Sequence, residues 1–156
     1  LSADDLTETF GTIARSGTSS FLEAIGENTD NKDAAKTLIG KFGVGFYSAF
    51  MVAEKVVATT RKAGEGDTLI WESDGKTGYT ITSSSDAHET GTSIKLFLRK
   101  DAKEYADVQR LKTLIKKYSD HILVPIFITA KDAEKEQANS AQALWTKSPS
   151  EISAEE

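Results

Sequence analysis

Three glycines within six residues constrain this chain more than any other feature. Gly40, Gly43 and Gly45 run straight into an apolar, helix-compatible segment, residues 46–52. Glycine adopts positive φ and has no Cβ, so neighbouring backbone N–H groups can turn toward one point and a ligand can approach closely. A helix beginning here would add unpaired N–H groups and a positive dipole end, which favour an anion. The pattern predicts a phosphate cradle, and a polyphosphate fits it.

The same glycines have a second interpretation, a tight turn that packs a helix closely against a sheet. Their order is G-x-x-G-x-G. A dinucleotide fingerprint reads G-x-G-x-x-G, and a P-loop ends in Gly-Lys followed by Ser or Thr, so neither motif is present. The pattern by itself leaves the cradle and the packing turn open.

Composition limits the classes of function. The net charge of −5 argues against a general nucleic-acid binder, which neutralises phosphates with Lys and Arg. The chain has no cysteine, and its two histidines are far apart, so no disulfide framework and no zinc-like ligand spacing are expected. No apolar run approaches the roughly 20 residues of a membrane-spanning helix. We expect a soluble, cytoplasmic domain without a membrane partner, truncated at its start because Leu1 is neither Met nor followed by a signal region.

Local patterns predict helices that precede and follow a set of antiparallel strands. Ser2 and Asp5 have the spacing of a capping box, and residues 27–36 form a polar loop able to close over a ligand. Hairpin signals join the first three strands, and alternation gives the fourth one buried face with Ile94 and Leu96. The longest helix should cover the sheet. The predicted helices are residues 3–14, 20–25, 46–51 and 102–121, and the predicted strands are residues 55–61, 68–73, 78–83, 92–99 and 123–128.

Six segments in sequence order resemble the ninety-kilodalton heat-shock chaperones, in particular their bacterial members. The first ends in GTIARSGT, the second reads IGKFGVGFYS and the third WES. The resemblance covers nearly the whole chain and favours the phosphate cradle over the packing turn. The segments are residues 6–18, 39–48, 71–73, 91–92, 117–122 and 139–146.

The resemblance implies an α+β fold of the Bergerat (GHKL) type. Its sheet is mixed but largely antiparallel and covered on one face by helices, with ATP on the helical side under a mobile lid, here about residues 9–42. The N-terminal strand and helix of that fold would be missing. The implied domains are the C-terminal part of the nucleotide-binding domain at residues 1–129, a charged linker at 130–138, and the start of a middle domain at 139–156, where Trp145 would find support.

The function that the resemblance implies is that of an ATP-dependent molecular chaperone of the stress response. ATP or ADP with Mg would drive lid closure and closure of a homodimer, and so fold and remodel unfolded or near-native client proteins. Two alternatives are another GHKL ATPase, such as a sensor kinase, a mismatch-repair ATPase or a topoisomerase subunit, and, for this segment alone, a non-catalytic interaction module.

The resemblance also assigns the nucleotide-binding residues. Thr92 would lie on the adenine side, and Leu1 and Phe10 would be apolar walls of the base pocket. Arg15 stands where the family usually has Lys beside the nucleotide, next to Ser16. The phosphate-facing backbone would be Gly43, Val44, Gly45 and Phe46.

The family's catalytic Glu and magnesium-ligand Asn lie upstream of the region that matches this chain. The Asp that pairs with the adenine amino group would come immediately before Leu1. We therefore expect no catalytic residue and no metal ligand within these residues. Hydrolysis requires an activated water and a bridging metal, so the chain alone is predicted to be inactive as an ATPase.

Overall fold

The computed structural model describes residues 1–12, 40, 42–64, 66–86, 88–131 and 133–142. The chain divides into two compact units, Leu1–Ala102 and Lys103–Glu156. The predicted helix at 20–25, the loop at 27–36, most of the predicted lid and Trp145 lie outside the described residues. Within these residues, no helix is both long and apolar enough to cross a bilayer.

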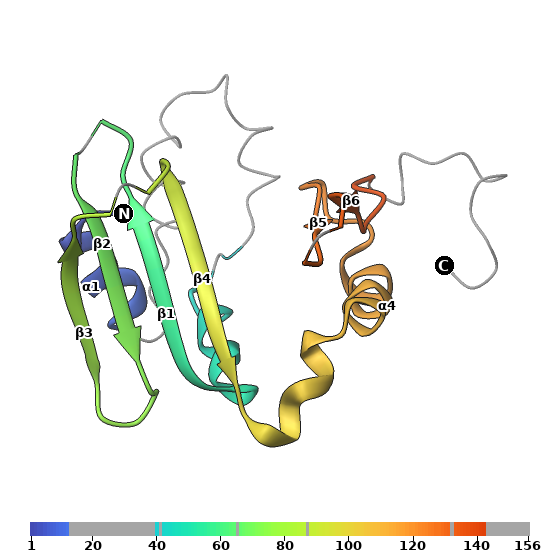
Figure 1. The fold of residues 1–156 in the computed structure, drawn as a ribbon, viewed down its shortest axis with the longest axis horizontal. Helices are drawn as coiled ribbons and strands as arrows, with labels where there is room; N and C mark the ends of the chain where they lie inside the picture. The colour runs from blue at the N-terminus through green and yellow to red at the C-terminus, as the bar shows by residue number, and fades with distance from the viewer. Residues whose placement is uncertain (13–39, 41, 65, 87, 132, 143–156) are drawn as a thin grey trace, which may run out of the picture. The chain divides into compact units, whose positions relative to one another are not determined.

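The first unit is built on a four-stranded sheet that is antiparallel throughout (Figure 1). The first three strands pair as a meander, as their hairpin signals predict, and the fourth returns to pair with the first. The α+β class with an antiparallel sheet is thereby confirmed. The strands are β1 (Ala53–Arg61), β2 (Thr68–Ser73), β3 (Tyr79–Ser84) and β4 (Gly91–Leu98), in the order β3-β2-β1-β4.

One face of this sheet carries the core. Alternation along β1 turns its buried side chains to the face where Trp71 stands opposite Ala58. Leu6 of helix α1 (Ala3–Phe10) is fully buried in the same cluster, and Phe46 of the 3-10 helix η2 (Phe46–Met51) packs against it. Each large apolar side chain buried here contributes roughly 1.5–3 kcal/mol. The helical segments of this unit therefore cover the face that the alternation of β1 defines.

Helix α1 begins where the capping box predicts and ends earlier than predicted. The Asp5 N–H donates to Ser2 Oγ at 3.1 Å, and the Ser2 N–H donates to an Asp5 carboxylate oxygen at 2.8 Å. The helix ends at Phe10, not at residue 14, with Gly11 as its C-cap. A Cβ at Gly11 would lie 2.5 Å from the Thr7 carbonyl oxygen and 2.7 Å from the Tyr79 hydroxyl. Contact with a distant strand therefore requires glycine where the helix ends.

The prediction that the fourth strand buries one of its faces is wrong for the central residues of that strand. Ile94 and Leu96 pair with inward residues of β1, yet they are 47% and 40% exposed. The reason is that β4 is an edge of the described sheet, whereas α1 and η2 pack on the cluster formed by β1 and β2.

In place of the single helix predicted at 102–121, the structure has two separate helical elements. A 3-10 helix, η3 (Lys100–Ala106), leads into the unit, and helix α4 (Val108–Ser119) follows it. Asp107 separates them, because its carboxylate accepts the Arg110 backbone N–H at 2.8 Å and so caps a new helix. The covering of the sheet by this segment stays a prediction.

The predicted strand at 123–128 is reduced to β5 (Phe127–Ile128), which pairs with β6 (Glu136–Gln137) inside the predicted linker. The structure differs because a side chain takes over the backbone hydrogen bonds before β5. Asn139 Oδ1 accepts the Ile126 N–H at 2.8 Å, and its amide nitrogen donates to three carbonyl oxygens at 3.0–3.2 Å. Residues 130–138 are thus not simply a solvated connection. The predicted domain limits stay a prediction.

Candidate functional site

The structure gives different reasons for a glycine at each of the three positions of the predicted cradle. Gly40 and Gly43 have φ of 90° and 63°, a region that favours glycine, so the turn itself explains them. Gly45 has φ −62° and ψ −38°, which any residue adopts, and a Cβ there would meet none of the described residues within 4 Å. Packing against the part of the chain that the structure describes does not explain Gly45, whereas close approach of a ligand would.

The helix predicted to follow the glycines is present as the six-residue 3-10 helix η2. Gly45 occupies its N-cap position and has no side chain with which to cap the N–H groups of the first turn. The Gly45 carbonyl accepts both the N–H and the hydroxyl of Ser48, at 3.2 and 2.6 Å. These bonds order the backbone on the C-terminal side of Gly45.

Aromatic packing joins the glycine segment to the end of α1. The Phe10 and Phe46 rings stack with centroids 4.0 Å apart, and each meets Trp71 edge to face at 5.6 and 5.4 Å. The Tyr47 hydroxyl donates to the Phe10 carbonyl at 3.2 Å. Burial, and then the nearby Tyr79, raises the pKa of Tyr47, so this donor is neutral near pH 7. The Phe46 side chain is partly buried and packs against the core cluster, which holds the backbone of this segment in place.

On the same face of the sheet, Thr60 contacts two of the predicted site residues, Leu1 and Thr92. Thr60 itself was not predicted from the sequence. Thr60 Oγ1 lies 2.9 Å from Thr92 Oγ1 and accepts a hydrogen bond at 2.9 Å from the amino-terminal nitrogen of this chain, on Leu1. Thr60 and Thr92 are direct partners across β1 and β4, so both point to the face on which α1 and η2 pack. Thr92 is exposed, whereas Thr60 is fully buried. The signal that could have found Thr60 is a polar residue at an inward position of an alternating strand.

Arg15 and Ser16, the remaining predicted nucleotide residues, lie outside the described part of the chain. Among the residues that the structure describes, no group of three His, Asp or Glu side chains could hold a metal ion. The structure thus brings Phe10 to Phe46, and it joins Leu1 and Thr92 only through their shared partner Thr60. The assignment of the phosphate contacts stays a prediction.

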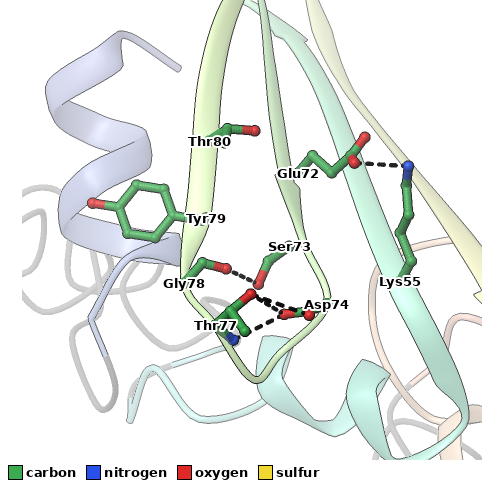
Figure 2. A pocket seen from close by; sticks show the side chains of 8 residues that line it. All are labelled: Lys55, Glu72, Ser73, Asp74, Thr77, Gly78, Tyr79 and Thr80. Carbon is green, nitrogen blue, oxygen red and sulfur yellow. Dashed lines mark hydrogen bonds and ion pairs between the residues drawn. The ribbon is translucent and has the colours of Figure 1, made fainter.

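A cavity of about 300 Å³ lies beside the turn between β2 and β3 (Figure 2). Its charged groups are already engaged by their neighbours. Lys55 pairs with Glu72 at 2.7 Å. Backbone N–H groups of Thr77 and then Lys76 hold the pKa of Asp74 below its usual value. The turn therefore explains the acidic group here without a ligand.

A second cavity, of about 310 Å³, lies between the end of α1, η2 and the β2–β3 turn. Phe10, Tyr47 and Trp71 contribute to its lining. The Trp71 indole N–H is buried and has no hydrogen-bond partner among the described protein atoms. The residues of the predicted cradle and Thr92 line neither of these two cavities.

Comparison with known proteins decides the family. Over its whole length the chain is 50% identical to "Chaperone protein HtpG" of Rickettsia massiliae, 49% identical to that of Paramagnetospirillum magneticum and 48% identical to that of Wolinella succinogenes. This chain is a homologue of chaperone protein HtpG. It spans about a quarter of the length of these HtpG relatives. No family model matches it. The resemblance to the bacterial heat-shock chaperones is confirmed.

Proposed function

We propose that this chain supplies the phosphate-binding and base-binding parts of an ATP-dependent molecular chaperone. Nucleotide-driven closure of a lid and of a homodimer would remodel unfolded or near-native client proteins. The observation that carries the proposal is Gly45 in a homologue of HtpG: an exposed glycine that neither its φ nor its packing against the described residues requires. Such a position is suited to a ligand that must come close to the backbone.

The phosphate contacts in this proposal are the backbone N–H groups of Gly43, Val44, Gly45 and Phe46. The positive φ of Gly43 turns the backbone before η2, and stacking of Phe46 on Phe10 holds the backbone after it. Because the ring is held in the core, the N–H groups would be preorganised before ligand binding. Preorganised donors lose little freedom when an anion binds.

The base contacts are the Thr92 hydroxyl and the apolar side chains of Leu1 and Phe10. The side on which Thr92 lies supports this assignment, because it is the face on which the helical elements pack. We assign Arg15 and Ser16 to the neighbourhood of the phosphates from the sequence alone. Mg would enter with ATP, bound to the phosphates.

The four-stranded antiparallel sheet with α1 and η2 on one face is compatible with part of a Bergerat (GHKL) fold, and we assign it so. Residues 1–129 then belong to the nucleotide-binding domain, 130–138 connect the domains, and 139–156 begin the middle domain. ATP hydrolysis would belong to the full-length cytoplasmic protein, with the catalytic Glu and the magnesium-ligand Asn contributed from outside this chain. The HtpG relatives favour the chaperone over the other GHKL ATPases.

The proposal is tested by Gly45→Ala in the full-length gene product, with ADP–Mg and adenosine titrated by calorimetry. The added methyl group should obstruct the phosphates and weaken ADP binding at least about tenfold, while adenosine binds as in the wild type. The matched control is Gly66→Ala, which also places a Cβ where no described residue lies within 4 Å. Both variants should melt at the wild-type temperature or slightly above it.

Unchanged ADP affinity in Gly45→Ala would overturn the cradle. Failure of the wild-type protein to bind any nucleotide would favour the non-catalytic interaction module. The chaperone part is tested by refolding of a heat-denatured client enzyme. ATP should increase the recovered client activity with the wild type and do so less with Gly45→Ala.

A further inference from the structure

Strand β3 forms one edge of the described sheet in the first unit (Figure 1). Its strand partner among the described residues is β2 alone, and all six residues of β3 pair with β2 in a register without a bulge. In an antiparallel pair, main-chain groups that bond to the neighbour alternate with groups that point away from it. The outer side of β3 therefore presents a regular row of main-chain donors and acceptors.

Sheet edges in soluble proteins are usually protected against an added strand by charged side chains, proline, a bulge or a covering segment. β3 reads Tyr-Thr-Ile-Thr-Ser-Ser, without a charge or a proline, and four of its six residues are exposed. β4, the other edge of the described sheet, carries Lys95, and a register shift interrupts its pairing with β1. Of these two edges, β3 is the one open to strand addition.

The side chains of β3 indicate which kind of strand would fit beside it. Tyr79 stacks on Trp71 and shares the inward face with Ile81, which packs against the core cluster. Thr80 points to the opposite side of the strand, as Figure 2 shows, and the exposed Thr82 shares that face. Side chains that lie beside each other across two strands interact directly. An added strand therefore fits best when apolar and polar side chains alternate along it.

The charges around β3 complement a basic partner. Asp74 lies in the turn before β3, and Asp86 follows the end of the strand by two residues. Within the described part of the chain, neither carboxylate takes part in an ion pair. Lys76 is the only cation in residues 74–86, so this stretch has a net charge of −1. A strand with a cation at each end would meet a carboxylate near each end of β3.

We propose that the outer edge of β3 binds an extended segment of an unfolded client protein as an added strand. The segment matches the six residues of β3, alternates apolar and polar side chains, and has Lys or Arg at its ends. Main-chain hydrogen bonds supply the affinity, so varied sequences of this pattern are accepted. The inference rests on the proposed function, which supplies the class of partner, but binding at β3 requires no nucleotide.

The test uses a synthetic octapeptide with six alternating valine and threonine residues and a lysine at each end. It is titrated into the full-length gene product by calorimetry. The control peptide has the same side chains and N-methyl groups on its six central residues, which removes the main-chain donors along both of its edges. The first peptide should bind, and the control should bind at least about tenfold more weakly. Amide hydrogen exchange of residues 79–84 should slow when the first peptide is bound.

Two variants with the same change in charge place the site on β3. Thr82→Lys puts a cation on the exposed face of β3 and should weaken peptide binding about tenfold, because lysine protects a sheet edge. Ser93→Lys makes the same change at an exposed position of β4 and should bind the peptide as the wild type does. Asp86→Asn should weaken binding about two- to fivefold, and it should not affect a peptide whose terminal lysines are replaced by glutamine.

No binding of the first peptide to the wild type would overturn the inference. Equal binding of the N-methylated peptide, or equal losses in Thr82→Lys and Ser93→Lys, would overturn it as well. If no peptide binds and Thr82→Lys sediments as a smaller species than the wild type, β3 is a contact between copies of this chain instead. Peptide binding at β3 without any nucleotide binding would refute the nucleotide part of the proposed function and leave this inference standing.

Discussion

Gly11→Ala is expected to destabilise the first unit through contacts that the structure specifies. A Cβ at this position would lie 2.5 Å from the Thr7 carbonyl oxygen, 2.7 Å from the Tyr79 hydroxyl and 2.8 Å from a Tyr79 ring carbon. Carbon and oxygen atoms at van der Waals contact are well over 3 Å apart, so a neighbour must move. Tyr79 can rotate, but the Thr7 carbonyl belongs to the helix backbone and cannot move without disturbing the end of α1.

The magnitude follows from two opposing terms. Overpacking of a tight site costs about 1–3 kcal/mol. Replacing glycine by alanine also restricts the unfolded chain, which stabilises the protein by about 0.4–1 kcal/mol where the backbone conformation suits alanine, and Gly11 has a φ of −87°. The net destabilisation is about 1–2 kcal/mol, which lowers the melting temperature by roughly 2–8 °C for a domain of this size.

The assay is denaturant unfolding of the chain in a Trp145→Phe background, which leaves Trp71 as the only tryptophan. Trp71 contacts Phe10, the residue before Gly11, at a centroid distance of 5.6 Å, so its fluorescence reports on this end of α1. Gly66→Ala is the control, because the added Cβ meets no atom of the described residues within 4 Å. Adding Tyr79→Phe to Gly11→Ala should restore little stability, because the Thr7 contact remains. Equal stability of Gly11→Ala and Gly66→Ala would refute this reasoning.

Two further predictions concern the second unit. Asn139 is only 5% exposed, and Asn139→Ala removes its four side-chain hydrogen bonds. This change should destabilise the second unit by about 2–5 kcal/mol, measured as a lower denaturation midpoint of the helical signal. A loss below about 1 kcal/mol would contradict this structure of the α4–β5 connection. For Asp120, burial raises the pKa, but hydrogen bonds from Lys116 and then Ser140 outweigh it and hold the pKa below 3.8. The unfolded state therefore binds the proton more readily, so this contribution to stability is complete above about pH 5 and is lost as the pH falls through 3.8 and below. Acid titration of the wild type and Asp120→Asn should show this loss in the wild type alone, and equal pH profiles would exclude it.

Sequence patterns that span only a few residues, such as a capping box or a turn, were sufficient to predict the start of α1 and the limits of β2. The Ser2–Asp5 capping box gives the start of α1, and the turn residues after 61 and 73 give β2 with its observed limits. The end of α1 could not be predicted in this way, because Gly11 is placed by the contact with Tyr79 on β3. Likewise the pairing of β6 with β5 depends on Asn139, whose side chain satisfies backbone groups that a longer strand would have used.

In the candidate site, too, some features could be predicted from the local sequence and others depend on contacts between distant residues. The positive φ of Gly43 could be anticipated from residue type, but the open space beside Gly45 is a property of the folded chain. Thr60 was missed because the local pattern marks it only as a polar residue at an inward strand position, whereas its partners come from the chain start and from β4. Resemblance to a family supplied Thr92, and pairing across the sheet then supplied Thr60.

The central claim is that the backbone N–H groups of residues 43–46 bind the phosphates of a nucleotide, and amide NMR tests it most directly. The full-length protein, labelled with ¹⁵N, would be titrated with ADP–Mg and separately with adenosine. ADP–Mg should shift the amide signals of Gly43, Val44, Gly45 and Phe46 and also that of Thr92, whereas adenosine should shift Thr92 and leave residues 43–46 nearly unchanged. Equal shifts of residues 43–46 with both ligands, or none with ADP–Mg at saturation, would contradict the claim.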